Sequence, residues 1–509
     1  MKKKDSSKLL YSYLLMILIF SIVVLCLFIS NEIKANNSWE EFSAYLEEDL
    51  PLLMENYNIP GANIAIIENG EVKIIKSYGF ANIEQELSMT VDKIFRADSI
   101  TKMFTAWGVI NLVEKGKLDL DAPAEKYLRR WNFPETEFDE NKITVRMLLS
   151  HSAGLPFGVY DGYNALAEEI PSLEESLSGK AGAPEAKPVQ EPGQSFVYSN
   201  PGFAVLELII EEVTGYDYAY YMEKEILSPL GMNNSGFLLT NEIKSNTVTN
   251  YNMGREAIPF SNIEAVKAHG GLYTTIEDLS KFTAAWMKNI ENREPGGKIL
   301  KPESIDKVHN QEVETTGMYK FFSDSYGLGH FIKNIANNQQ VIFHGGEGSG
   351  SGSIAAGIPE MGAGIIILTN SNGSWQFLAA VLDHWIDYLG IEWQGISYIF
   401  QVAEIVAKVI LTIILFLSVF MIWKIIRGFV SGQRHFKPLA KKSRILRFFQ
   451  FIIAVLILLI WWGTSIKELL VWLLPNLSLC LEAALIIFSL LLILLSIFTK
   501  ESKKSKLNT

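Results

Sequence analysis

Four long apolar runs divide this chain of 509 residues, and they constrain its fold more than any other feature. They cover Leu9–Ser30, Val402–Ile426, Phe448–Trp462 and Leu479–Thr499. Each run is long enough, or nearly so, to cross a membrane as a helix. The third is the shortest, and it gains length if Arg447 and Lys467 extend their charged ends to the membrane surface. The sequence therefore predicts four membrane helices, three of them within 396–509.

Basic residues orient these predicted helices. The loop Arg427–Arg447 carries seven Lys and Arg residues and no acidic residue, and both ends of the chain are also basic. Core helices of a soluble domain are the alternative, but one basic loop and the short connection Gly463–Asn476 are all that join the last three runs. Because basic loops stay in the cytoplasm, we expect a multi-pass cell-membrane protein, in contact with membrane lipids, whose residues 36–395 lie outside the cytoplasm.

The first apolar run also fits a cleaved signal peptide, because Lys2, Lys3 and Lys4 precede it and Ala35 is a candidate cleavage position. Its length favours a retained anchor. Under either interpretation, we expect the middle of the chain to be exported. The predicted domains are an anchor or signal in 1–35, an extracytoplasmic domain in 36–395 and a membrane region of three helices in 396–509.

The middle region is strongly acidic. Residues 36–395 carry 26 Lys and Arg residues against 50 Asp and Glu residues, which argues against binding nucleic acid or an anionic membrane surface. Both cysteines, Cys26 and Cys480, lie in apolar runs, so we expect no disulfide or thiol chemistry in the exported domain. The sequence offers no His-Glu-x-x-His motif, and we expect neither a metal nor a cofactor.

Residues 36–395 mix helix and strand patterns. Amphipathic spacing predicts helices over Trp39–Tyr57, Phe203–Thr214 and Trp375–Leu389. Apolar runs predict strands over Ala62–Glu68, Glu71–Gly79, Ile354–Ile358 and Ala363–Thr369. The dipeptide Asn69-Gly70 between the first two strands is typical of a hairpin turn. The composition of Pro171–Pro192, rich in Glu, Ser, Gly, Ala and Pro, predicts a mobile loop at the rim of a cleft.

The segment Ser99-Ile100-Thr101-Lys102 opens another predicted helix. Residues three apart on a helix lie on one face, so the two ends of this segment can touch. A serine beside a lysine is the arrangement that a serine nucleophile and its base require. The alternative is an ordinary helix cap with a lysine in its first turn, so the meaning of Ser99 and Lys102 depends on the rest of the chain.

Two further motifs follow in order. Tyr198-Ser199-Asn200 lies on a predicted loop before a helix, where chemistry is usually presented, although Tyr198 could equally be a buried aromatic residue. His344-Gly345-Gly346-Glu347 ends a predicted strand, and a Gly/Ser turn is expected over Gly348–Ser353. We interpret these glycines as positions where another backbone segment comes close.

Together the three motifs resemble those of the serine β-lactamase and penicillin-binding-protein superfamily, in particular its class C β-lactamase-like branch. The flanking segments Leu149–Pro156, Pro229–Met232 and Gly270–Tyr273 also look like that branch, and the resemblance covers about residues 45–390. It implies an α/β (α+β) fold, in which an antiparallel sheet is flanked by helices and carries an all-helical subdomain. The active-site cleft would lie between the sheet and that subdomain.

The resemblance also implies roles for the matched residues. Ser99 would attack a carbonyl, and Lys102 would assist removal of its proton. Tyr198 would serve as partner base or acid, and Asn200 would position the substrate. The backbone N–H groups of Ser99 and Glu347 would form the oxyanion hole. His151 has no assigned role in the family, so we interpret it as structural.

One departure from the family bears on the substrate. The third motif is usually Lys-Thr-Gly, whose lysine helps to hold a substrate carboxylate, whereas this chain has His344, Gly345 and Gly346. A mostly neutral histidine is a poorer carboxylate anchor, and Glu347 would repel a carboxylate if it faced the cleft. Esterase, amidase or D-aminopeptidase reactions are therefore favoured over β-lactam hydrolysis, unless His344 merely fills the end of the strand.

The leading hypothesis is a membrane-anchored, extracytoplasmic serine hydrolase that cleaves amide or ester bonds of a small molecule or peptide through an acyl-enzyme on Ser99. The three C-terminal helices resemble those of prodrug-activating peptidases that remove an acyl-D-asparagine cap, although they could be a plain anchor. A D,D-peptidase or β-lactamase is a further alternative. A penicillin-acylated membrane sensor is the alternative that is not an enzyme.

Overall fold

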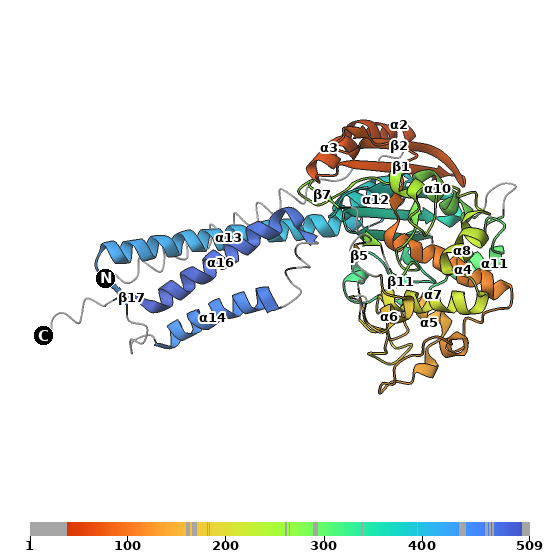
Figure 1. Ribbon diagram of the computed structural model, residues 1–509. Helices are drawn as coiled ribbons and strands as arrows, with labels where there is room; N and C mark the ends of the chain where they lie inside the picture. The colour runs from red at the N-terminus through yellow and green to blue at the C-terminus, as the bar shows by residue number, and fades with distance from the viewer. Residues whose placement is uncertain are drawn as a thin grey trace. The chain divides into compact units, whose positions relative to one another are not determined.

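The computed structural model describes most of the chain after Ser38 (Figure 1). The described residues are 38–158, 163–164, 170–180, 182, 184–259, 262–263, 265–288, 294–336, 339–393, 395–436, 444–463, 467, 470 and 473–500. One compact unit spans Ala35–Ile396, and the chain from Ser397 onward belongs to a second unit. The predicted first membrane helix, Leu9–Ser30, lies outside the described residues.

A nine-stranded antiparallel sheet forms the centre of the first unit, with the strand order β10-β11-β12-β13-β14-β15-β1-β2-β3. Its strands are β1 (Gly61–Glu68), β2 (Glu71–Asn82), β3 (Leu87–Ser88), β10 (Val313–Glu314), β11 (Ser325–Tyr326), β12 (Phe331–Asn334), β13 (Gln340–Gly348), β14 (Ser351–Ile358) and β15 (Ala363–Thr369). Short strands outside it include the pair β4 (Phe95–Arg96) and β9 (Tyr273–Thr274). The sheet therefore joins the two ends of the unit's sequence, since β15 pairs with β1.

Turn residues set two hairpins of this sheet. Asn69 and Gly70 both have positive φ, at 51° and 68°, and they connect β1 to β2 as predicted. The Gly/Ser turn expected over Gly348–Ser353 is present but shorter than predicted, because β13 runs to Gly348, β14 begins at Ser351 and only two residues form the turn. Glycine has a low strand propensity and is common in loops. Here, however, the glycines lie within the strands, where the missing side chain lets neighbouring groups come close to the backbone.

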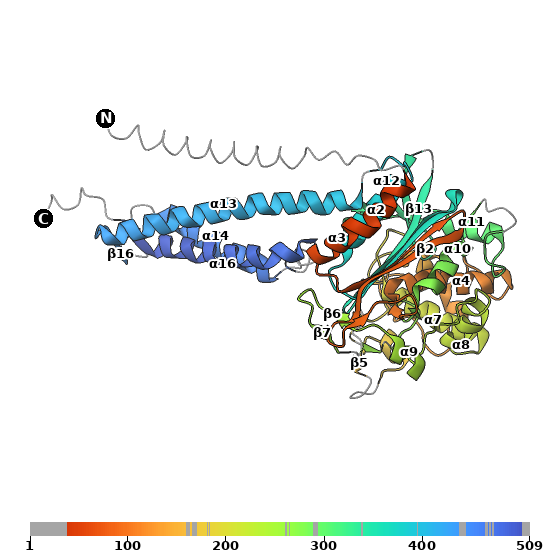
Figure 2. The same cartoon turned by 90° about the horizontal axis from the view of Figure 1, so that it is seen from above.

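Helices cover both faces of the sheet (Figures 1 and 2). A methyl group added at Gly364 or Gly357 would meet Met287, just after α10 (Ile276–Ala285), and one added at Gly345 would meet Trp375 of α12 (Trp375–Tyr388). Strand alternation puts these glycines on opposite faces, so α10 and α12 lie on opposite sides. Two N-terminal helices, α2 (Trp39–Ala44) and α3 (Leu50–Asn56), pack on α12.

A group of helices on the α10 side forms the predicted helical subdomain. It contains α4 (Thr101–Glu114), α5 (Val145–Leu149), α6 (Leu173–Leu177), α7 (Asn200–Thr214) and α8 (Tyr218–Met222), which pack on one another. Two further helices of the first unit are α9 (Asn241–Asn246) and α11 (Pro302–His309). The mobile loop expected over 171–192 is partly wrong, since α6 lies inside it. Ser172 and Glu175 form a capping box there, and that local signal was hidden by the loop-like composition.

In the described part of the second unit there are three apolar helices, α13 (Ile396–Val430), α14 (Arg444–Gly463) and α16 (Pro475–Ile497), and α14 packs on α16. By length and composition, α13 and the segment Leu477–Ile497 could each cross a membrane, whereas α14 is shorter. The last predicted run extends past its helix, because Phe498–Lys500 forms β17, which pairs with β16 (Arg434–Phe436).

Aromatic packing between α4 and α10 generates the first prediction. The ring of Phe282 is fully buried and stacks on Phe104 with a centroid distance of 3.8 Å. We expect Phe282→Ala to lower the free energy of unfolding by ~3–5 kcal/mol, since the cavity cannot close fully. Urea denaturation of the full chain in detergent, followed by near-UV circular dichroism, measures this change. Tyr220→Ala, at a half-exposed ring of α8, is the control and should change stability by less than ~0.5 kcal/mol.

Candidate active site

Ser99 and Lys102 meet at the start of the helical subdomain. A short 3-10 turn, η2 (Asp98–Ile100), carries Ser99 and leads directly into α4. The Nζ atom of Lys102 lies 3.0 Å from Ser99 Oγ and 2.9 Å from the backbone oxygen of His269. Burial lowers the pKa of Lys102 well below its ordinary value, although the nearby charge of Asp98 opposes this shift. The pair predicted from the sequence is therefore in contact, and the amine is disposed to be neutral.

The backbone around His269, whose carbonyl accepts a hydrogen bond from Lys102, is fixed by buried polar groups. Glu207 of α7 accepts hydrogen bonds from the N–H groups of Lys267 and Ala268, at 2.6 and 2.8 Å. Thr105 of α4 donates to the Ala268 oxygen at 2.6 Å. Burial raises the pKa of Glu207 to about 7, and Lys267 and the two N–H groups oppose that shift. These contacts hold the His269 carbonyl over the lysine.

Tyr198 lies beside the same pair. It precedes Ser199, whose Oγ caps α7 by accepting from Gly202 N at 3.2 Å. Lys102 Nζ lies 4.9 Å from the centre of the Tyr198 ring. Burial raises the pKa of Tyr198 far above its ordinary value, with Tyr319 adding to the shift, and the Ser99 side chain is near enough to lower it slightly. The phenol is therefore neutral and can donate a proton.

His151 fixes the loop that carries this tyrosine. Its Nδ1 accepts the N–H of Ser199 at 3.0 Å, and its backbone oxygen accepts the N–H of Val197 at 2.8 Å. Burial lowers the pKa of His151 well below its ordinary value, which keeps Nδ1 free of a proton. The structural role expected from the sequence thus becomes specific, because His151 holds the residues on either side of Tyr198.

Asn200 is the first residue of α7 and lies on the buried side of this loop. Its side-chain oxygen Oδ1 has no hydrogen-bond partner among the residues that the structure describes. Buried acceptors in proteins are nearly always paired, so this oxygen is available to a donor on a bound molecule.

His344 and Gly346 of β13 face the Ser99 turn. His344 is buried, its Nε2 lies 3.2 Å from the Tyr326 hydroxyl, and its ring centre lies 6.2 Å from that of Tyr198. Burial lowers the pKa of His344 well below its ordinary value, so the ring carries no charge to attract a carboxylate. At Gly346, an added Cβ would lie 2.4 Å from the backbone oxygen of Ala97, so only glycine allows this approach.

The side chain of Glu347 points to the opposite face of the sheet from His344 and Gly346. Successive strand residues point to opposite sides of a sheet, and Glu347 accepts a hydrogen bond from Trp375 Nε1 at 2.7 Å on the α12 side. Its carboxylate therefore points away from the side on which Gly346 meets the Ser99 turn. The repulsion of a substrate carboxylate, expected if Glu347 faced the cleft, does not arise from this geometry.

Sequence reasoning missed Asp98, which is buried directly before Ser99 and has a positive φ of 49°. Ser351 Oγ donates to Asp98 Oδ2 at 2.6 Å, and Arg96 Nε lies 3.1 Å from Oδ1. Burial raises the pKa of Asp98, while Arg96, Ser351 and Lys102 act in the opposite direction. An acidic residue directly before the proposed nucleophile was the available signal.

No group of three or more His, Cys, Asp or Glu side chains in the described part of the chain is arranged to hold a metal ion. The site is built from the serine, lysine and tyrosine already described, with polar contacts from neighbouring backbone.

Comparison with known proteins places these motifs in a family. The model of the family described as Beta-lactamase matches residues 46–384. The chain is 25% identical over 356 residues to Protein flp of Staphylococcus aureus (strain NCTC 8325 / PS 47), a match that covers 69% of this chain and 66% of that protein. It is also 25% identical over 372 residues to Unguisins hydrolase ungD' of Aspergillus campestris (strain IBT 28561), covering 70% and 66% of the two chains. The match thus spans slightly less than two thirds of the length of these curated relatives.

A solved structure has a similar fold. The octameric penicillin-binding protein homologue from Pyrococcus abyssi is 30% identical and superposes with a TM-score of 0.57, over 67% of this chain and 77% of that one. The predicted fold class, an antiparallel sheet flanked by helices with apolar C-terminal helices, is confirmed.

The charge of Asp98 generates a prediction for the reactivity of Ser99. A neutral Lys102 can accept the serine proton, and it is neutral only above its pKa. Because Asp98 raises that pKa, removing its charge in Asp98→Asn should lower it. The acidic limb of the pH profile for labelling Ser99 with a fluorophosphonate probe should therefore move to lower pH.

The control for this experiment is Glu86→Gln, which removes an exposed carboxylate and should leave the profile in place. An acidic limb that stays fixed, or moves to higher pH, in Asp98→Asn would contradict the coupling between Asp98 and Lys102.

Proposed function

The chain belongs to the β-lactamase family, and from the geometry around Ser99 we propose that it is a serine hydrolase that cleaves amide or ester bonds through an acyl-enzyme. One observation carries the proposal. A fully buried lysine, whose pKa is lowered by burial, lies 3.0 Å from the hydroxyl of a half-buried serine. Such a pair supplies a nucleophile and a base whose neutral form is favoured by burial.

Acylation follows from the positions of the side chains. Lys102 takes the proton of Ser99 Oγ as the oxygen attacks the carbonyl carbon of the substrate. The N–H groups of Ser99 and Glu347 stabilise the negative charge that develops on the carbonyl oxygen. The neutral phenol of Tyr198 gives its proton to the leaving amine or alkoxide, and Lys102 returns a proton to the phenol. The products of this step are a Ser99 ester, a released amine or alcohol, and a neutral lysine.

Deacylation reverses these transfers. A water molecule attacks the Ser99 ester while Lys102 accepts its proton. The same lysine then returns the proton to Ser99 Oγ as the carboxylic acid leaves. No proton is gained or lost by the protein over the cycle, and the transfer between Ser99 and Lys102 uses their 3.0 Å contact.

The substrate class follows from the third motif. The neutral His344 supplies no cation to hold the carboxylate of a β-lactam or of a D,D-peptide. We therefore favour esters or amides of small molecules or peptides over β-lactams, and the name of the Aspergillus relative, a hydrolase, supports hydrolysis. The unpaired Oδ1 of Asn200 would accept a hydrogen bond from an amide N–H of the substrate.

A second candidate is removal of an acyl-D-amino-acid cap from an exported precursor. The apolar helices α13 and α16 favour it, because they would hold the enzyme beside a lipid-tailed substrate. We further propose that these helices anchor the chain and that residues 36–395 work outside the cytoplasm, which the basic loop after α13 supports.

Removing the nucleophile tests the function. Ser99→Ala should abolish fluorophosphonate labelling and lower hydrolysis of any substrate found for the wild type by about a thousand-fold or more. Competition of the labelling by acyl-D-asparagine amides and by penicillin would rank the two candidate substrate classes.

Ser88→Ala, at an exposed serine of β3, is the matched control and should behave as the wild type does. The assignment fails if Ser99→Ala keeps full turnover. A penicillin adduct on Ser99 that is never hydrolysed would instead support an acylated sensor.

Cysteine labelling tests the location. In a chain whose two native cysteines are replaced by alanine, a membrane-impermeant maleimide should label Ser88→Cys in intact cells. It should label Ser431→Cys, in the basic loop, only after the cells are permeabilised. Labelling of Ser431→Cys in intact cells would contradict the proposed orientation.

A further inference from the structure

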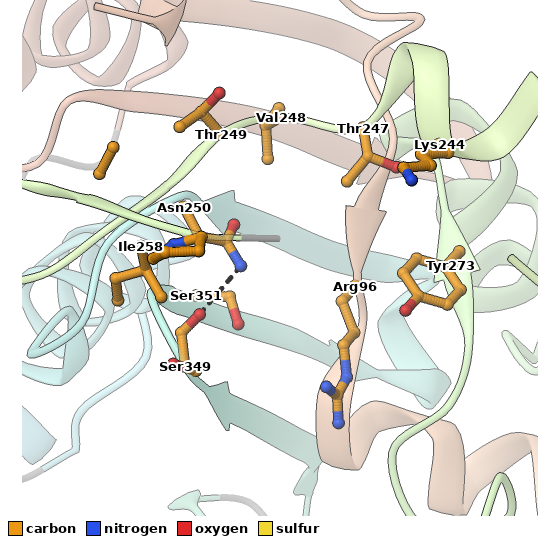
Figure 3. Close-up of a pocket in the computed structure, with 12 residues that line it drawn as sticks. Arg96, Lys244, Thr247, Val248, Thr249, Asn250, Ile258, Tyr273, Ser349 and Ser351 are labelled. Atoms are coloured by element: carbon orange, nitrogen blue, oxygen red, sulfur yellow. Dashed lines mark hydrogen bonds between the residues drawn. The ribbon is translucent and has the colours of Figure 1, made fainter. Parts of the chain in front are cut away.

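A cavity of about 430 Å³ opens beside the Ser99 turn and is separate from the residues that perform the proposed chemistry. Figure 3 shows the hairpin residues Ser349 and Ser351 on one side of this space and Tyr273 and Lys244 on the other. Arg96 of β4 lies between them.

The pocket is basic in an acidic domain. Among the residues that the structure describes, Arg96 and Lys244 line it and no acidic side chain does, although residues 36–395 carry 50 acidic residues and 26 basic ones. Arg96 is already paired with Asp98, at 3.1 Å from Nε to Oδ1, so Lys244 is the main charge open to a ligand.

Lys244 is exposed in the last turn of α9, and no ion pair joins it to another residue of the described chain. The Tyr273 hydroxyl adds a donor, whereas Thr247 Oγ1 already donates to the backbone oxygen of Ile243 at 2.7 Å. Lys244 and Tyr273 are therefore the groups of the pocket that are suited to an anion.

Apolar groups form the rest of the wall. Val248, Ala257 and Ile258 line the pocket, and its volume exceeds that of a bare carboxylate, which occupies a few tens of Å³. The lining therefore matches a ligand that has both a short aliphatic chain and a charged end. Inorganic phosphate would satisfy the basic groups but would leave this apolar wall unfilled.

The position of the pocket relates it to one side of the substrate. Along β13, His344 lies near Tyr198, which is the proposed donor to the leaving group. Glu347 follows, and the hairpin turn at Ser349 comes two residues later, about 7 Å farther along a strand. Ser351 then returns to Asp98, the neighbour of Ser99, through a 2.6 Å hydrogen bond. The pocket thus lies at the end of β13 that is opposite Tyr198.

A leaving group departs toward its proton donor, so the acyl part of the substrate extends the other way. We propose that the pocket binds a carboxylate at the far end of the acyl group, with Lys244 as its principal charged contact, so that the enzyme prefers acyl groups that end in a carboxylate. This inference rests on the proposed function, and it names the class of acyl group that the site accepts.

Two esters of equal chain length test the preference, with the full chain in detergent. Mono-4-nitrophenyl adipate carries a terminal carboxylate, and 4-nitrophenyl hexanoate carries a methyl group in its place. Lys244→Gln should lower kcat/KM for the adipate ester about tenfold and change that for the hexanoate ester less than about twofold. Lys117→Gln, at an exposed lysine after α4 that does not line the pocket, should change neither value. Ser99→Ala gives the background rate.

A calorimetric titration of the same proteins keeps this inference separate from the proposed function. Free adipate should bind the wild type, and Lys244→Gln should weaken its binding about tenfold, whereas neutral hexanamide should bind the two proteins equally. If neither ester is hydrolysed but adipate binding depends on Lys244, the proposed function fails and the carboxylate pocket stands.

Three results would overturn the inference. The first is Ser99-dependent hydrolysis of both esters with the same response to Lys244→Gln. The second is a lack of adipate binding, or adipate binding that Lys244→Gln leaves unchanged. The third is Lys244-dependent binding of inorganic phosphate without binding of adipate, which would make the pocket a phosphate site.

Discussion

Taking a lysine ammonium out of water costs several kcal/mol unless the group is paired or loses its proton, and Lys102 is fully buried. The protein offers it the Ser99 hydroxyl and the His269 carbonyl. Neither partner is charged, so burial favours the neutral amine, and the neutral amine is the form that can act as a base. The polar groups around it, including Glu207 and Thr105, serve this arrangement by fixing the backbone that carries the carbonyl. Asp98 limits the shift, and it thereby sets the pH range in which the pair can react.

Close backbone approach is the second requirement of the site. The β13–β14 hairpin touches the Ser99 turn where Gly346 leaves room for the Ala97 carbonyl, and Ser353 Oγ donates to the same oxygen at 3.1 Å. This contact brings the backbone of Glu347 to the nucleophile while strand alternation sends its side chain toward Trp375. The same hairpin ends at the basic pocket. In the proposed mechanism, β13 would therefore connect the leaving-group end of the site, the position of the oxyanion and the acyl-binding pocket.

Local pattern was enough to predict part of this site. The three-residue spacing of Ser99 and Lys102 on a helix, and the place of Tyr198 on a loop before α7, follow from rules that act within one turn. Contacts made across the fold could not be found in this way, because Asp98 and Ser351 are 253 residues apart and His151 and Ser199 are 48 apart. The glycine-rich run was misjudged as a longer turn because glycine has low strand propensity whether it forms a loop or permits close packing. The direction of Glu347 needed the register of β13, which the sequence alone does not provide.

A direct measurement of the Lys102 pKa tests the central claim that burial supplies an unprotonated base. In protein labelled with ¹³C at lysine Cε, the Lys102 resonance is the one that disappears in Lys102→Met. Its chemical shift, followed against pH by NMR, should titrate well below the range of the exposed lysines, as burial predicts. A Lys102 resonance that titrates together with those of the exposed lysines would contradict the account, because the residue beside Ser99 would then be a cation at neutral pH.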